Sequence, residues 1–171
     1  AVVKKGINDH TVVDLARHFK GSGHIVRFIE FMDVGATNGW RLDNVVTGQE
    51  IVDLINAELP IEPVKANYRG EVARRWRYTD GSGEVGVITS ISEPFCGDCT
   101  RARLSPEGSL YTCLFGDHGH DFRGLLRGGK SDDEIAAFLG SVWQIRNDRY
   151  SEIRSEDTIG LSKVEMSRIG G

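Results

Sequence analysis

The spacing of apolar residues in the first 32 positions predicts a strand, a helix and a second strand. Residues 2–4 are expected to form a short first strand. Residues 25–32 are almost continuously apolar, which is typical of a strand buried on both faces of a parallel sheet. Between them, Asn8 or Asp9 can cap a helix with i, i+3, i+4, i+7 spacing. The apolar residues of that helix are Val12, Leu15, Ala16 and Phe19. This order predicts a βαβ unit, as found in Rossmann-like sheets and (β/α) barrels.

Beyond residue 45 the pattern changes to capped helices and strands joined by tight turns. Thr47 with Glu50, and Ser131 with Glu134, have the spacing of a capping box and predict two helix starts. The turn segments 80–83 and 105–108 each separate two stretches suited to strands, which predicts two antiparallel hairpins. We expect their strands at 71–79 and 84–90, and at 101–104 and 109–115. The charged, weakly periodic residues 147–171 are expected to form a tail over the surface or into a cleft.

The second turn, Ser-Pro-Glu-Gly, also predicts a register. Pro106 suits the second position of a type I turn, and Gly108 suits the left-handed residue of a three-residue hairpin loop. The expected cross-strand pairs are Ser105 with Ser109, Arg103 with Tyr111, and Arg101 with Cys113. Alternation then places Cys99, Arg101, Arg103 and Cys113 on one face, and Ala102, Leu104, Thr112 and Leu114 on the other.

Composition indicates a soluble globular protein. The 171 residues include 21 Lys and Arg against 25 Asp and Glu, for a net charge of −4. This acidic balance argues against a nucleic-acid groove, which needs a basic face. Neither a run long enough to span a membrane nor a secretory signal is recognisable, so we expect a cytoplasmic protein, or a mitochondrial one in a eukaryote.

The three cysteines carry the chemistry, with the spacing C-x2-C-x13-C at Cys96, Cys99 and Cys113. Two thiolates at C-x2-C spacing can bind one metal centre, and Gly97 between them permits a tight turn. A structural zinc site would need a fourth ligand, such as His118 or His120. Three thiolates equally suit a 4Fe-4S cluster that leaves one iron open for a substrate. The spacing alone leaves both possibilities open.

Several segments, taken in order, resemble the molybdenum cofactor biosynthesis protein A family, the radical S-adenosylmethionine (SAM) enzymes known as GTP 3′,8-cyclases. The resemblance covers essentially the whole chain, and the segment that contains Cys96, Cys99, Arg101 and Arg103 is its most specific part. The segments are Arg27–Gly35, Ile88–Cys99, Arg101–Ser105, Cys113–Phe115 and the terminal Gly170-Gly171.

The resemblance implies an α/β fold in three parts. Residues 1–45 would form the last strands and helix of a partial (β/α) TIM-like barrel. Residues 46–146 would form an α+β C-terminal domain whose antiparallel hairpins carry an iron-sulfur cluster and bind GTP. Residues 147–171 would be a tail ending in Gly-Gly.

The same resemblance implies residue roles. Cys96, Cys99 and Cys113 would hold a 4Fe-4S cluster whose open iron binds the guanine of GTP. Arginines bind phosphate oxygens well, and the residues implied to bind the nucleotide are Arg101, Ala102, Arg103 and Arg27. Met32 would lie close to SAM. Gly170 and Gly171 would act in catalysis by reaching into the active site, and a homodimer is possible.

One feature departs from the family pattern. The first cluster of the family, which cleaves SAM, needs a C-x3-C-x2-C motif, and all three cysteines here belong to the other motif. We expect that this motif lies in residues upstream of Ala1, because the chain opens abruptly in an apolar stretch. On this interpretation the longer parent is the enzyme and this chain by itself is inactive. The alternatives are a zinc-stabilised structural or interaction module, and a nucleotide-binding relative without radical chemistry.

Two candidate residues carry further expectations. Arg27 lies in an apolar strand, so we expect it to be buried and to serve either a structural carboxylate or the substrate. Met32 lies at an odd offset from Arg27, so both can face one cavity only if Met32 lies at or beyond the strand end. His118 and His120 are expected to lie in loops, and Arg74, Arg75 and Arg77 on a solvated hairpin face.

Overall fold

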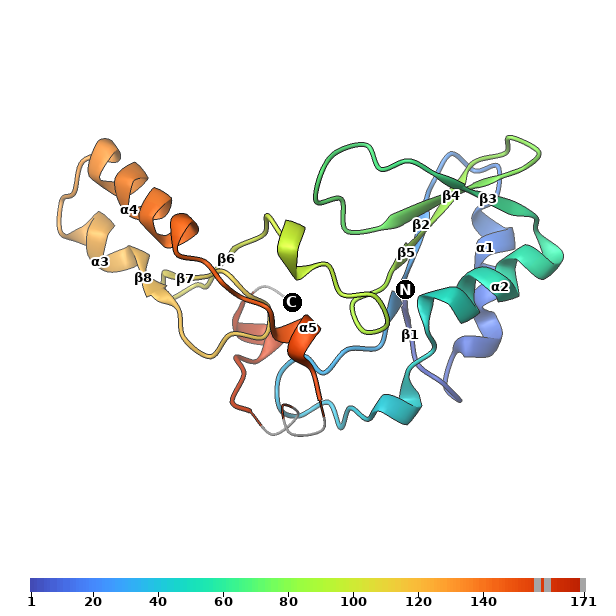
Figure 1. Cartoon of the computed structure of the whole chain (residues 1–171), viewed down its shortest axis with the longest axis horizontal. Helices are drawn as coiled ribbons and strands as arrows, with labels where there is room; N and C mark the ends of the chain where they lie inside the picture. The colour runs from blue at the N-terminus through green and yellow to red at the C-terminus, as the bar shows by residue number, and fades with distance from the viewer. Residues whose placement is uncertain (156–157, 159–160, 170–171) are drawn as a thin grey trace. The chain divides into compact units, whose positions relative to one another are not determined.

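The computed structural model describes all residues except 156–157, 159–160 and 170–171 (Figure 1). The chain forms two compact units. The first comprises Ala1–Met32 and Trp40–Cys99, and the second comprises Asp33–Gly39 and Thr100–Gly171. The domain limits expected at residues 45 and 146 stay a prediction. The sheet of the first unit contains strands from both sides of residue 45.

The first unit is built on a mixed five-stranded sheet with the order β1-β2-β5-β4-β3. Strand β2 lies parallel to β1 and to β5, whereas β4 pairs antiparallel with β5 and with β3. The strands are β1 (Val2–Val3), β2 (Val26–Glu30), β3 (Ile61–Val64), β4 (Arg74–Tyr78) and β5 (Glu84–Ile88). The βαβ unit and the first hairpin are therefore confirmed, while β3 had no expected counterpart.

Helices α1 (Val12–Phe19) and α2 (Gly48–Glu58) pack against each other and against the sheet, where Figure 1 shows them together. Their apolar faces and the strands enclose one core, in which Phe28, Ile51 and Ile55 are fully buried. The predicted capping box at Thr47 and Glu50 is present in both directions, and it begins α2. Helix α2 ends at Glu58, just before Pro60, which cannot continue a helix.

Strand β2 differs from the expectation that it would be buried on both faces. Val26, Phe28 and Glu30 are buried, but Arg27 is exposed and Ile29 is half-buried. The expected burial of Arg27 is therefore wrong. Neighbouring side chains of a strand point to opposite faces of the sheet. Helices α1 and α2 cover only one face of the sheet, so only the side chains on that face of β2 lie in the core.

The described residues of the second unit include a small sheet and several helices. The antiparallel strands β6 (Arg103–Leu104), β7 (Ser109–Tyr111) and β8 (His120–Asp121) lie in the order β6-β7-β8. The helices are α3 (Phe122–Arg127), α4 (Asp132–Gln144) and α5 (Tyr150–Ile153). The predicted capping box at Ser131 and Glu134 is present and begins α4.

The register expected from the Ser-Pro-Glu-Gly turn is confirmed where the strands pair. Arg103 lies opposite Tyr111, and the Ser105 N–H donates to the Ser109 carbonyl at 2.9 Å. Gly108 has a φ of +83°, as the three-residue loop requires. The β6–β7 pairing ends at Arg103 and Tyr111, so the expected ladder pair of Arg101 with Cys113 lies outside it. His120 lies in β8, so its expected loop position is wrong.

Candidate functional site

The C-x2-C motif forms a single tight turn in the first unit. Cys96–Asp98 is a 3-10 turn, and the Cys99 N–H donates to the Cys96 carbonyl at 3.1 Å. Residues three apart in such a turn emerge on the same side, which suits two thiolates that bind one metal centre. Both thiols are half-buried and neither is in a disulfide. Arg69 contacts the Asp98 carboxylate at 2.7 Å and ties the turn to the segment before β4.

A buried carboxylate holds the segment that leads into this turn. Glu30, at the end of β2, accepts hydrogen bonds from the N–H groups of Ile91 at 2.6 Å and Ser92 at 2.9 Å, and also from the Ser92 hydroxyl. The carboxylate of the next residue, Glu93, pairs with Arg74 on β4. The chain therefore reaches Cys96 from a firmly bonded segment rather than from a loose loop.

Cys113 lies in the second unit, in the segment that follows β7. The Phe115 N–H points at the Cys113 sulfur with an N···S distance of 3.5 Å, and the Gly116 N–H donates to the Cys113 carbonyl at 3.3 Å. Cysteine binds metals in its thiolate form. Like the other two cysteines, Cys113 is half-buried and outside any disulfide. The donor chemistry of all three thus fits a metal site.

The arginines expected near the nucleotide follow the predicted alternation. Arg101 and Arg103 are half-buried, whereas Ala102 and Leu104 are exposed, so burial alternates along residues 101–104 as expected. Arg27 lies on the exposed side of β2, where its side chain crosses Gly86. Met32 is half-buried and lies two residues beyond the end of β2. This position beyond the strand end is the one at which Met32 and Arg27 could both face one cavity.

The second unit contains a buried ionic cluster that was not predicted from the sequence. Asp33 is 2% exposed, and its carboxylate accepts from the Tyr150 hydroxyl at 2.6 Å, from Arg154 Nε at 2.9 Å and from Lys163 Nζ at 2.9 Å. Lys163 also donates to the Asp33 carbonyl at 2.9 Å. Burial alone would raise the pKa of Asp33, but the hydrogen bonds from Tyr150 and Lys163 and the two positive charges together lower it below 3.8.

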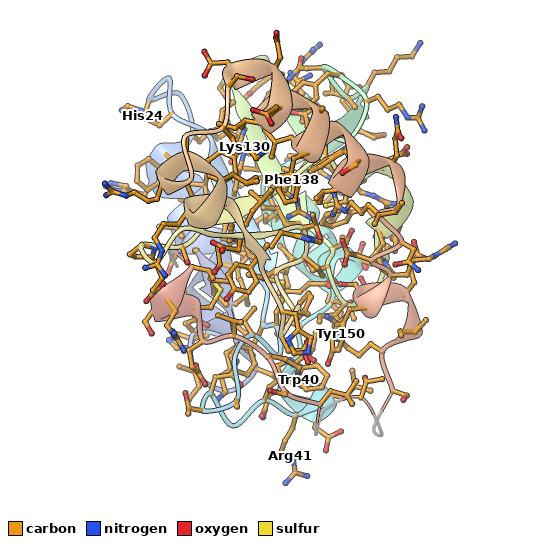
Figure 2. The ribbon with its side chains drawn as sticks, turned by 90° about the vertical axis from the view of Figure 1, so that its left-hand side faces the viewer. His24, Trp40, Arg41, Lys130, Phe138 and Tyr150 are labelled. Atoms are coloured by element: carbon orange, nitrogen blue, oxygen red, sulfur yellow. The ribbon has the colours of Figure 1, made fainter. Side chains whose placement is uncertain are left out.

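Tyr150, labelled in Figure 2, joins this cluster to an aromatic pair. Its ring stacks on Phe115 with the centroids 4.6 Å apart, and the Arg154 guanidinium lies 5.0 Å from the centre of the Phe115 ring. Burial and the hydrogen bond to Asp33 raise the pKa of Tyr150 above 10.0. An Asp that follows an apolar strand is by itself only a weak indication of a buried ionic cluster. The tail that contains the partners of Asp33 has no periodic pattern from which they could be identified.

Across the described residues, no group of three or more His, Cys, Asp or Glu side chains is gathered as a metal site. Cys96 and Cys99 belong to the first unit and Cys113 to the second. The expected tail glycines, Gly170 and Gly171, lie outside the described residues. Within the same described part of the chain, no helix is both long and apolar enough to cross a membrane.

Comparison with known proteins gives consistent matches along the chain. The family described as Molybdenum Cofactor Synthesis C matches residues 24–152. A GTP 3′,8-cyclase of Xanthomonas campestris pv. campestris is 50% identical over 170 residues, which are 99% of this chain and 50% of that protein. A GTP 3′,8-cyclase of Acidothermus cellulolyticus is 45% identical over all of this chain and 54% of its own length. One from Staphylococcus epidermidis is 45% identical over 99% of this chain and 51% of its own. The chain thus spans about half the length of these relatives.

Proposed function

The chain belongs to the Molybdenum Cofactor Synthesis C family, and we propose that it is the C-terminal part of a GTP 3′,8-cyclase. The parent would be a radical SAM lyase that converts GTP to (8S)-3′,8-cyclo-7,8-dihydroguanosine 5′-triphosphate in molybdenum cofactor biosynthesis. The observation that carries this proposal is identity of 45–50% along essentially the whole chain to relatives of that name.

Within this part, Cys96, Cys99 and Cys113 would hold a 4Fe-4S cluster. The same-side turn of the first two thiols and the N–H donated to the sulfur of the third support this assignment. When bound, a cluster with three protein ligands has one open iron, a Lewis-acidic position for a ring atom of guanine. The chain's own contribution would be to supply the three sulfurs, with the Phe115 N–H donated to that of Cys113.

Arg101 and Arg103 would bind the triphosphate, with Ala102 between them and Arg27 as a further contact. Guanidiniums present planar donors to phosphate oxygens and stay charged at any physiological pH. The alternating burial of residues 101–104, with both arginines at the half-buried positions, supports a common ligand for the pair. The exposure of Arg27 on β2 leaves its side chain accessible to a substrate.

The remaining expectations concern the parent. β1 and β2 would be the last strands of a partial barrel that carries the SAM-cleaving cluster, with Met32 close to SAM. A homodimer and a cytoplasmic location are compatible with this role. Gly170 and Gly171 would complete the active site from the tail.

Anaerobic reconstitution with iron and sulfide tests the central assignment. We expect this chain to bind one oxygen-sensitive 4Fe-4S cluster, measured by iron and sulfide content and by the visible spectrum. Replacing Cys96, Cys99 or Cys113 by Ala should remove most of the iron. Full iron retention in C113A, or tight stoichiometric zinc in place of iron, would contradict the proposal and favour a zinc-stabilised module.

A further inference from the structure

The C-terminal segment, which we define as residues 146–165, contacts the residues around Cys113 at three points. Arg146 Nη2 donates to the Thr112 carbonyl at 2.7 Å, one residue before Cys113. The Tyr150 ring stacks on Phe115, two residues after it, with an interplanar angle of 18°. The Val164 N–H donates to the Gly116 carbonyl at 3.1 Å. All these residues belong to the second unit, so the position of Cys113 depends on residues 33 to 51 positions later in the chain.

Asp33 in turn fixes this C-terminal segment. Its carboxylate receives Tyr150, Arg154 and Lys163, and the side chains of Arg154 and Lys163 are 6% and 2% exposed. Two buried cations beside one carboxylate would repel each other without it, because water cannot screen them there. The Glu165 carboxylate adds a second tie, since it accepts from the Ala36 N–H at 2.8 Å.

We infer that Asp33 is a positioning residue for Cys113. By neutralising Arg154 and Lys163 and binding Tyr150, it holds the C-terminal segment on both sides of Cys113, and that segment fixes the thiol and its Phe115 N–H. The consequence for cluster binding rests on the proposed function, whereas the control of Cys113 follows from contacts inside the second unit. Removal of the carboxylate should loosen Cys113 without loosening Cys96 and Cys99.

The test is the rate of alkylation of each cysteine by iodoacetamide, followed by mass spectrometry in the metal-free full chain. We expect D33N to accelerate alkylation of Cys113 at least tenfold and to leave Cys96 and Cys99 within twofold. Y150F keeps the stacked ring and removes one donor to Asp33, so it should accelerate Cys113 alkylation by a smaller factor. If D33N does not fold by circular dichroism, Y150F decides the question.

A matched pair of charge removals provides the control. K163M removes one cation of the buried cluster, whereas K130M removes one cation of the exposed pair between Lys130 and Glu134 at the start of α4 (Lys130 is labelled in Figure 2). K163M should accelerate Cys113 alkylation and K130M should not. Unchanged Cys113 alkylation in folded Y150F and K163M would overturn the inference, and so would equal acceleration of all three cysteines, which would indicate a general loss of stability.

Iron measurement separates this inference from the proposed function. If the cluster forms, D33N or Y150F should lose iron to a chelator several times faster than the unsubstituted chain. An unsubstituted chain without iron would contradict the proposed function, while the alkylation result would still decide the role of Asp33.

Discussion

The buried carboxylate of Glu30 accepts the N–H of Gly48, the first residue of α2, at 2.6 Å. Glu30 is fully buried, and it also accepts the N–H groups of Ile91 and Ser92. One carboxylate at the end of β2 thus joins the strand, the positive end of a helix and the segment that leads to Cys96. Its hydrogen-bond donors are three backbone N–H groups and the Ser92 hydroxyl.

The first prediction concerns the stability contributed by this carboxylate. E30A leaves the buried N–H of Gly48 and the partly buried N–H groups of Ile91 and Ser92 without their acceptor, and hydrogen bonds to charged groups contribute about 1.5–3 kcal/mol each. We expect E30A to lower the free energy of unfolding by at least about 3 kcal/mol in urea titration. E62A, at an exposed position on β3, is the control and should change stability by less than about 0.5 kcal/mol. Similar values for the two variants would contradict this role of Glu30.

The second prediction concerns the turn between β6 and β7. A Cβ at Gly108 would lie 2.5 Å from the Arg123 Cβ, and the φ of +83° disfavours any L side chain. G108A should therefore destabilise the protein by more than the roughly 1–2 kcal/mol of left-handed strain alone. Gly129 has a φ of +71° and open space around it, so G129A measures the strain without the clash. Equal unfolding midpoints for the two variants would show that the clash relaxes at no cost.

This turn shows what could be predicted from the sequence. Pro106 and Gly108 determine a loop length and a conformation within four residues, and the register of Arg103 with Tyr111 follows from them. The two capping boxes were predictable for the same reason, because each motif contains both partners of the interaction. The alternation of half-buried and exposed positions from Arg101 to Leu104 is equally local.

The ionic cluster and the burial of β2 depend on distant contacts instead. Asp33 and Lys163 are 130 residues apart, and no local pattern in a charged tail identifies which Lys is buried. Arg27 was expected to be buried because the strand around it is apolar. Its exposure depends on which face of the sheet α1 and α2 cover, and this is a property of the tertiary packing.

The third prediction is a pH dependence of stability. The pKa of Asp33 is lowered below 3.8 in the folded protein, so its carboxylate stabilises the fold fully above that ordinary value. The contribution is lost as the pH falls below 3.8 through the lower folded pKa. The difference in urea midpoint between the unsubstituted chain and D33N should therefore be large at pH 6 and should shrink as the pH falls below 3.8. A difference that is independent of pH would contradict an ionised Asp33.

The fourth prediction concerns GTP. Charge-assisted hydrogen bonds contribute about 1.5–3 kcal/mol, so R101A or R103A should weaken GTP binding by roughly tenfold or more. The measurement is GTP affinity in a full-length parent, with iron content determined on the same samples. R127A, at an exposed position at the end of α3, is the control and should leave the affinity unchanged. Unchanged affinity in R101A with intact iron would contradict the role of Arg101, and lost iron would assign that residue to the fold.

The last prediction concerns Gly170 and Gly171, which follow a buried residue, since Ile169 is only 2% exposed. Two terminal glycines bury little apolar surface and lose much conformational freedom when ordered, so they should contribute little to folding. Deleting both from a full-length parent should leave the melting temperature and iron content nearly unchanged while strongly reducing conversion of GTP. Because the glycines would act by insertion, a synthetic peptide ending in Met-Ser-Arg-Ile-Gly-Gly should restore part of the turnover. A truncated enzyme with full activity would show that the two glycines have no role in catalysis.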